Sequence, residues 1–274
     1  MADFLTRPLS NRRRKDITSL QHRKYRARHG ETIVEGTRAV TSAIEAGAPV
    51  TDVVLTSDMA DRNEIMRPLE TLSGEIPIWI ADDADMSDVS GVDSPQGVLA
   101  VVERQYADTA TVVEAETTLS ESEVTLLALD GVQDPGNVGT IIRTAAWFGV
   151  SAIVAGPGTA GLFGPKVMRA AMGGHWDLSL ARTDTLGETL DTCRHGGFPI
   201  YGADLYGTGA GQWAPHHPSV LVLGSEAHGL SAAVLDRLDE PVAIPGAPNR
   251  QGAESLNVAI ASGILVYEWM NISG

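Results

Sequence analysis

The chain has 274 residues, of which 43% are hydrophobic and 20% are charged, a composition that can build a core and excludes global disorder. Its single cysteine, Cys193, rules out an internal disulfide and a cysteine-cluster metal site, and it fits a reducing, cytoplasmic setting. No run of about 18 apolar residues occurs in the sequence, so we expect no membrane span.

The charge is distributed unevenly along the chain. The net charge is −15, yet residues 1–30 hold nine basic and two acidic side chains, a local charge of +7 that leaves −22 on the rest. We expect this segment to be a basic arm that contacts a polyanion; a solvated terminus without a partner is the alternative. The acidic remainder also fits a high-salt cytoplasm, where surface carboxylates preserve solubility.

A short mixed domain is predicted up to residue 105. Helical patterns cover residues 21–29 and 37–46, and apolar strand-like runs cover residues 50–56, 76–80 and 97–103. The stretch that follows is rich in Thr, Ser, Ala and Glu and has no strong period, so residues 106–122 are predicted to be a linker. A second domain is then expected over residues 123–274.

In the second domain, apolar runs alternate with helical stretches. Strands are expected at residues 125–129, 151–155, 178–181, 199–203, 220–223 and 241–244. Helices are expected at residues 138–148, 165–172, 186–194 and 232–238, and a long apolar helix from Glu254 to about Met270. This alternation predicts an α/β fold with a parallel sheet covered on both faces. The last helix is apolar enough to be buried, in part against a second copy of the chain.

Three loops that follow predicted strands have unusual compositions, and ligands of open parallel sheets bind beyond the carboxyl ends of the strands. The first loop covers residues 130–137. It ends at Asn137, a candidate helix N-cap, and Arg143 follows inside the helix. A Gly/Pro turn with a cap and a surface arginine fits the same residues.

The second loop covers residues 224–229 and directly follows a predicted strand. Gly224 allows a ligand to approach the backbone closely. Glu226 is a candidate site carboxylate, although a cap for the helix that begins near Ser231 fits its composition equally well.

The third loop joins Ile244 to the start of the last helix at Ser255, Leu256 and Asn257. Ser and Asn at such a position often only cap the helix. Because an apolar helix follows, a buried cradle for a ligand, lined by backbone, is the second interpretation.

One competing motif points to a different cofactor. Residues 156–161 match G-x-G-x-x-G after a strand, but a dinucleotide fingerprint opens its helix at once, whereas here Gly164 and Pro165 intervene. A glycine-rich turn explains the motif, and a nicotinamide-dependent oxidoreductase stays as an alternative. No metal site is expected. The adjacent His216 and His217 would point to opposite sides of any strand, and the other histidines considered, His175, His195 and His228, lack ligand spacing.

Taken together and in this order, the three loops resemble the motifs of the SpoU/TrmH-type RNA 2′-O-ribose methyltransferases. The matching stretches are DPGNVGTIIRTAAWFGV at 134–150, LVLGSEAHGLS at 221–231, VAIPG at 242–246 and ESLNVAIASG at 254–263. The first domain, with Glu35-Gly36 and Ser94-Pro95-Gln96-Gly97, looks like the small substrate-binding domain of this family, which is similar to an RNA-binding ribosomal protein.

The resemblance implies a methyltransferase that acts on RNA, with ribosomal RNA preferred over transfer RNA, and that uses S-adenosylmethionine as methyl donor. It also implies a C-terminal trefoil knot and a homodimer formed through the knot region. The positions that match the family's catalytic residues are Arg143, Asn137 and Glu226. The positions that match its cofactor-binding residues are Gly224, Ile244, Leu256, Ser255 and Asn257.

The chain departs from the family pattern in its cofactor loops. Ser225 stands where Asn is usual, Ala227 where Gly is usual and Gly246 where Met is usual, and the stretch from 245 to 255 is about three residues longer. An RNA-binding module that kept the fold and lost catalysis is therefore a further alternative. The presence of Asn137, Arg143, Glu226 and Asn257 argues against it.

Overall fold

The computed structural model describes residues 6–72, 76–109, 112, 124–249, 251–252 and 254–271. The chain divides into two compact units. The first comprises Met1–Gln105 together with Phe163–Trp176, and the second comprises Tyr106–Leu162 and Asp177–Gly274. The segment Phe163–Trp176 joins the first unit by contacts such as the buried bond of 2.7 Å from Thr32 Oγ1 to the Phe163 carbonyl.

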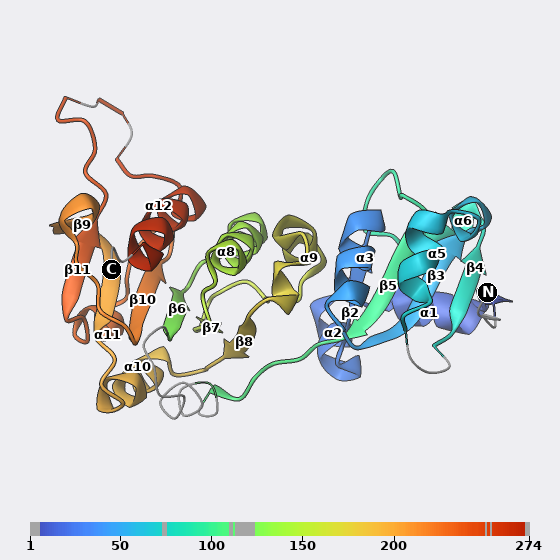
Figure 1. Ribbon diagram of the computed structural model, residues 1–274, viewed down its shortest axis with the longest axis horizontal. Helices are drawn as coiled ribbons and strands as arrows, with labels where there is room; N and C mark the ends of the chain where they lie inside the picture. Colours follow the sequence, from blue (N-terminus) through green and yellow to red (C-terminus); the bar gives the residue numbers. More distant parts are fainter. Residues whose placement is uncertain are drawn as a thin grey trace. The chain divides into compact units, whose positions relative to one another are not determined.

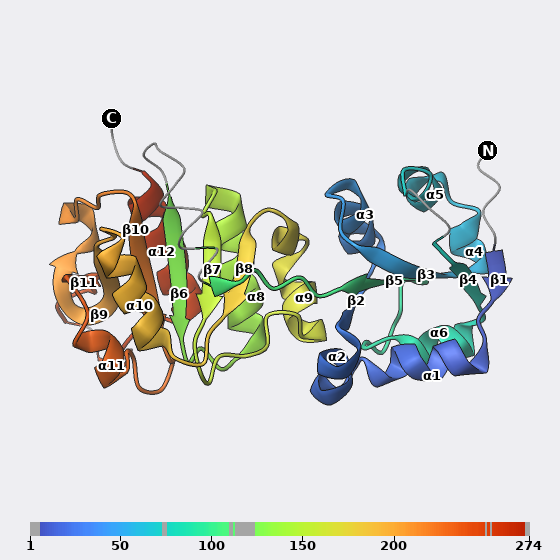
Figure 2. The same ribbon diagram turned by 90° about the horizontal axis from the view of Figure 1, so that it is seen from below.

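The first unit is built on a five-stranded mixed sheet in the order β1-β4-β3-β5-β2. The strands are β1 (Thr6–Pro8), β2 (Glu31–Glu35), β3 (Val50–Thr56), β4 (Ile78–Ala81) and β5 (Val98–Glu103). The helices are α1 (Asn11–Ser19), α2 (Arg23–His29), α3 (Thr37–Glu45), α4 (Ser57–Ala60), α5 (Asn63–Leu69) and α6 (Asp83–Val89). Helices α1 and α6 pack together on one face of the sheet, and α3 and α5 on the other (Figure 2).

The described part of the basic N-terminal segment, residues 6–30, is folded into the first unit, and its contact with a polyanion stays a prediction. Strand β1 pairs in parallel with β4, and α1 buries Ile17 in the core. The Arg13 guanidinium forms two hydrogen bonds with the Asp52 carboxylate, of 3.0 Å and 2.5 Å. Arg14 pairs with Asp85. Charge in this segment therefore serves partly to attach α1 to the rest of the domain.

Several elements of the first unit gave no clear signal in the sequence. Helix α1 is almost entirely polar, with Ile17 as its one buried residue, so it lacks an apolar period. Strand β2 reads ETIVE, and its charged ends leave an apolar run too short to identify. The helices α4, α5 and α6 have four to seven residues and were also missed.

The second unit contains a six-stranded, entirely parallel sheet in the order β11-β9-β10-β6-β7-β8 (Figure 1). The strands are β6 (Thr125–Asp130), β7 (Ala152–Ala155), β8 (Ser179–Arg182), β9 (Ile200–Gly209), β10 (Ser219–Gly224) and β11 (Glu240–Ala243). The helices are α8 (Pro135–Phe148), α10 (Leu186–His195), α11 (Ala232–Leu235) and α12 (Val258–Met270), while α9 (Pro165–Ala171) belongs to the first unit. The prediction of a parallel α/β domain is confirmed.

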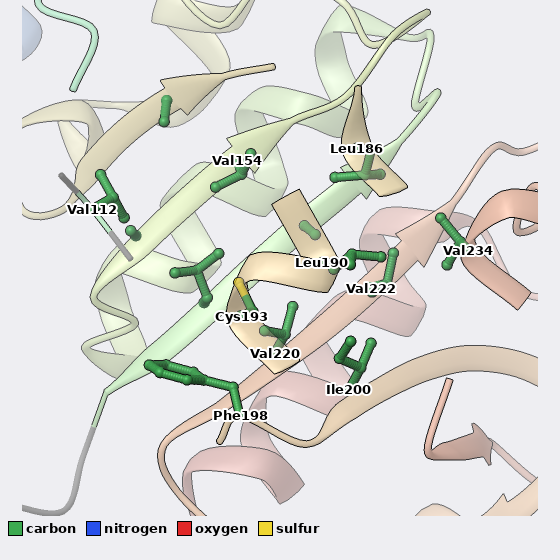
Figure 3. Packing of buried hydrophobic residues seen from close by; sticks show 14 of the residues in the cluster. Val112, Val154, Leu186, Leu190, Cys193, Phe198, Ile200, Val220, Val222 and Val234 are labelled. Atoms are coloured by element: carbon green, nitrogen blue, oxygen red, sulfur yellow. The ribbon is translucent and has the colours of Figure 1, made fainter. Parts of the chain in front are cut away.

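One part of the core of the second unit lies between the sheet and α10. Figure 3 shows Leu190 and Cys193 of α10 next to β10, the strand that carries Val220 and Val222, with Phe198 nearby. Burial raises the pKa of the Cys193 thiol to about 11, so the thiol stays protonated. Cys193 is thus a buried residue of the core.

The glycine-rich loop at 156–161 braces the end of β6. Thr159 Oγ1 donates to the Leu129 carbonyl at 3.0 Å and accepts from the Gly131 amide at 3.1 Å. Helix α9 begins only at Pro165. The loop is a turn that supports the first candidate loop, which favours the structural interpretation of the motif.

The predicted linker is only partly described. Ala107 pairs with Ala181 of β8, and Val112 is buried in the core of the second unit, so these residues pack on that unit. The other residues from 110 to 123 lie outside the described part, and the domain boundaries stay a prediction.

Helix α12 packs against α8 and β10. Its end is held by Trp269, whose indole Nε1 donates to Ser219 Oγ at 2.9 Å. The helix begins at Val258 instead of Glu254, because Asn257 is its N-cap. A knotted path of the chain stays a prediction. None of the helices in the described residues is long and apolar enough to cross a membrane.

Candidate active site

The second and third loops meet at one cavity of about 770 Å³. All five positions predicted to bind the cofactor line it: Gly224, Ile244, Ser255, Leu256 and Asn257. Glu226 lines it as well. The first loop lies next to the second because β6 and β10 are paired neighbours that end together, with Asp130 opposite Gly224. The sheet order therefore brings the three loops to one edge, where parallel strands place their ligands.

The second loop is a tight turn that depends on Gly224. Ser225 and Gly229 exchange two backbone hydrogen bonds of 2.9 Å, which close the turn. A Cβ on Gly224 would lie 2.3 Å from the Gly229 carbonyl carbon, a distance that the backbone cannot accept. The sequence identified this glycine for approach by a ligand, and the structure shows that the loop itself also requires it.

Asn257 caps the last helix and points its amide toward the first loop. Its Oδ1 accepts from the backbone amides of Ala259 at 2.9 Å and Ile260 at 3.3 Å. Because the helix N-terminus holds the oxygen, the Nδ2 group faces outward and donates to Asn137 Oδ1 at 3.0 Å. The cap thereby links the third loop to the first.

Asn137 is not the N-cap of its helix, so that prediction was wrong. Asp134 is the cap, since its Oδ1 accepts from the amides of Gly136 at 2.7 Å and Asn137 at 3.0 Å. The Asn137 side chain is left available for other partners. It accepts from Asn257 and donates its Nδ2 to Glu226 Oε1 at 2.7 Å.

The Glu226 carboxylate completes this chain of side-chain hydrogen bonds. It also accepts from the backbone amides of Gln133 at 3.2 Å and Asp134 at 3.4 Å. Desolvation opposes its ionisation, but the hydrogen bond from Asn137 and the backbone amides outweigh it and lower the pKa of Glu226 below its ordinary value. Glu226 therefore holds the first loop and does not cap α11.

Arg143 lies apart from this hydrogen-bonded chain. Its side chain is exposed and has no hydrogen bond or ion pair within the part of the chain that the structure describes. It does not line the cavity. Within the described residues, Asn137 and Glu226 thus contact the first loop and not the Arg143 guanidinium.

Strand β9 supplies cavity residues that the sequence did not reveal. It was predicted to end at residue 203 but runs to Gly209, and Asp204, Leu205 and Tyr206 line the cavity. Tyr206 is 88% exposed at the rim. The rule that ligands lie beyond strand ends, applied to β9 as well, could have found them.

The cavity fits S-adenosylmethionine in size and chemistry. Its volume lies within the roughly 300–1,000 Å³ that is usual for small-molecule sites. Apolar side chains such as Val242 and Leu256 line it beside the carboxylates of Asp204 and Glu254, so both an adenosine moiety and a cationic sulfur find suitable surroundings. In the described residues no cluster of three His, Cys, Asp or Glu side chains is placed to hold a metal.

Comparison with family models identifies both parts of the chain. Residues 125–267 match the SpoU rRNA Methylase family, and residues 11–100 match the MRM3-like substrate binding domain. The first match covers the strands and loops that form the cavity. The second covers most of the first unit.

Relatives of known name align over nearly the whole chain. The 23S rRNA (guanosine(2553)-2'-O)-methyltransferase RlmP of Bacillus subtilis is 32% identical over 94% of this chain and 95% of its own length. The 23S rRNA (uridine(2479)-2'-O)-methyltransferase of Streptomyces viridochromogenes is 31% identical over 91% of this chain and 85% of its own. The AdoMet-bound rRNA methyltransferase from Sinorhizobium meliloti superposes with a TM-score of 0.81 at 27% identity, covering 96% of this chain and 97% of that one.

Proposed function

Because the chain belongs to the SpoU rRNA methylase family, and is thus an RNA ribose 2′-O-methyltransferase with S-adenosylmethionine as methyl donor, we propose that its substrate is ribosomal RNA. The two relatives named above both modify 23S ribosomal RNA, one at a guanosine and the other at a uridine. The large-subunit RNA is therefore the proposed target.

One observation carries the assignment of the site. The five predicted cofactor positions surround a single cavity, and hydrogen bonds between Glu226, Asn137 and Asn257 join the loops around it. We assign the cavity to the methyl donor. When bound, the donor supplies an activated methyl group on a sulfonium, so the protein has mainly to position the reactants and exclude water.

In this proposal Arg143 acts on the RNA. A guanidinium is a very weak acid, so removing its proton is costly and a role as general base is disfavoured. Its planar donors suit a phosphate next to the reacting ribose, and its charge stabilises the negative charge that develops on the 2′-oxygen. The exposed, unpaired Arg143 of the described structure is free to take this role. Asn137 and Glu226 are positioning residues that fix the loop before its helix.

We further propose that the protein works as a homodimer. Helices α8 and α12 pack together and expose large apolar side chains: Trp147 is 83% exposed, Ile260 57%, Tyr267 49% and Ile264 37%. Arg143 precedes Trp147 by four positions and so shares its face of α8. A second copy is the occupant that explains this face, because isologous packing buries the same apolar surface of both copies at once.

The test is methyl transfer to defined RNAs. The purified protein is incubated with methyl-labelled S-adenosylmethionine and unmodified 23S, 16S or transfer RNA made by transcription. We expect label in 23S RNA at one ribose, which then resists alkaline cleavage. Label confined to transfer RNA would refute the proposed substrate, and the absence of label in every RNA would refute the function.

A further inference from the structure

The basic side chains of the N-terminal segment differ in whether they already have partners. Arg13 and Arg14 form ion pairs with aspartates. Arg26 turns back and donates to the carbonyls of Leu20 at 2.7 Å and Gln21 at 2.8 Å, which secures the end of α1. These three arginines maintain the fold.

Other cations of the segment are unengaged. On α2, the side chains of Arg23, Lys24 and Arg28 are exposed and have no hydrogen bond or ion pair with any residue that the structure describes. The sequence from Ile17 to Gly30 contains four basic side chains and no acidic one, on a chain whose net charge is −15. An isolated positive surface on an acidic protein points to a polyanionic partner.

Aromatic rings lie on the same helix between these cations. The Tyr25 ring lies 6.4 Å from the His29 ring at an interplanar angle of 20° and 6.4 Å from the His22 ring at 58°. Position 22, the N-cap, and positions 25 and 29 fall on one face of the helix. Arg28 borders this face, and Lys24 lies beside Arg28 one turn earlier. His22 and His29 are exposed, whereas Tyr25 is half-buried and anchors the row.

We propose that this face of α2 is the surface on which the first unit docks a single-stranded segment of the RNA substrate. Bases stack on the row of His22, Tyr25 and His29, and phosphates contact Lys24 and Arg28. This combination of a ring platform and bordering cations is the means by which proteins bind unpaired nucleotides. The inference rests on the proposed function, since it assigns a docking surface to the same RNA.

The rings separate RNA from other anionic partners. An acidic protein or a membrane of anionic lipids would be attracted by Lys24 and Arg28 but would gain little from flat exposed rings. RNA uses both, because each base offers a face for stacking while each phosphate offers a charge.

The experiment measures binding of a short fluorescein-labelled oligoadenylate to the full-length protein by fluorescence anisotropy. The double variant Lys24→Glu/Arg28→Glu should bind more than about tenfold more weakly, and losing two phosphate contacts should reduce the slope of log K against log salt by about 1.4. Tyr25→Leu/His29→Leu should bind about fivefold or more weakly with an unchanged slope, and Tyr25→Phe should retain the wild-type affinity. The matched control is Arg38→Glu/Arg67→Glu, which makes the same charge change at exposed sites on α3 and α5.

Either of two results in the binding experiment would overturn the proposal. Equal loss of affinity in the control would show a general charge effect. If the charge variants lose affinity and the ring variants do not, the surface binds by charge alone, which would favour an acidic or lipid partner. Methyl transfer to 23S RNA tests the docking surface and the proposed function separately. For the α2 variants we expect a raised KM and an unchanged kcat. If the wild type methylates this RNA while the α2 variants keep its KM and oligoadenylate affinity, the surface is wrong and the function stands. If no RNA is methylated although α2 variants lose binding, the function fails and the surface stands.

Discussion

Asn137 and Asn257 are 120 positions apart in the sequence, yet Asn257 Nδ2 donates a hydrogen bond of 3.0 Å to Asn137 Oδ1. The other hydrogen bonds of the two side chains fix which amide donates and which accepts in this contact. The N-terminus of α12 fixes the Asn257 oxygen, and the Glu226 carboxylate accepts from the Asn137 amide. Each amide thus has one possible orientation, and the three loops are held in register.

Substitution of Asn257 separates its two roles. Serine can still cap α12, because its hydroxyl accepts from the same backbone amides, but it is too short to reach Asn137. We expect Asn257→Ser to keep the melting temperature and to bind S-adenosylmethionine more weakly in calorimetry. Asn257→Ala loses the cap as well, at about 1 kcal/mol, and should also melt earlier. If Asn257→Ser and the wild type bind S-adenosylmethionine with equal affinity, the hydrogen bond to Asn137 does not contribute to cofactor binding.

Replacement of Glu226 by glutamine should cause a pH-dependent loss of stability. Because the pKa of Glu226 is lowered in the folded protein, its stabilisation is fully present above the ordinary value of 4.5 and is lost as pH falls through the folded value. The melting temperature of Glu226→Gln should thus be lower at neutral pH, by no more than about 2–4 °C for so exposed a side chain. The difference should vanish in stronger acid. In an Asn137→Ala background the difference at neutral pH should be smaller, and an undiminished difference would count against the Asn137–Glu226 pair.

Gly224→Ala should disrupt the cofactor loop. The added Cβ would collide with the Gly229 backbone at 2.3 Å, so the turn after β10 has to open. We expect the affinity for S-adenosylmethionine to fall by about tenfold or more in calorimetry. The matched control is Gly161→Ala, where an added Cβ meets no atom within 4 Å and binding should be unchanged. Wild-type affinity in Gly224→Ala would show that the cavity does not depend on this turn.

Arg143→Ala should separate chemistry from cofactor binding. Loss of a donor to developing negative charge costs about 100-fold in turnover, whereas the affinity for S-adenosylmethionine should be retained because Arg143 does not line the cavity. Single-turnover transfer to 23S RNA and calorimetry give the two readouts. Arg182→Ala, also an exposed arginine of the second unit, is the control. An unchanged rate in Arg143→Ala would exclude the proposed role.

The apolar face of α8 and α12 predicts the oligomeric state. Ile260→Glu/Ile264→Glu places two charges on it, so we expect light scattering to report a dimer for the wild type and a monomer for the variant. The conservative Ile260→Val/Ile264→Val keeps the face apolar and should remain dimeric. A monomeric wild type at micromolar concentration would refute the dimer.

The sequence alone predicted most of the second unit. All six strands of its sheet were found, because strands buried on both faces read as short continuous apolar runs. Gly224, Asn137 and Glu226 were chosen as candidates for a different reason. Glycine and short polar residues are typical of tight turns and of backbone that lines a ligand. In the first unit the polar α1 and the short β2 carry too few buried side chains to show a period.

Only the tertiary structure decided how these residues meet and which of them are free. The hydrogen bond between Asn137 and Glu226 forms because β6 lies beside β10 in the sheet. The crossover connections set this strand order, and the apolar periodicity of the sequence does not reveal it. The same holds for the basic segment, where contacts with distant aspartates engage Arg13 and Arg14 and leave Lys24 and Arg28 exposed. Composition counts charges, whereas long-range packing determines their partners.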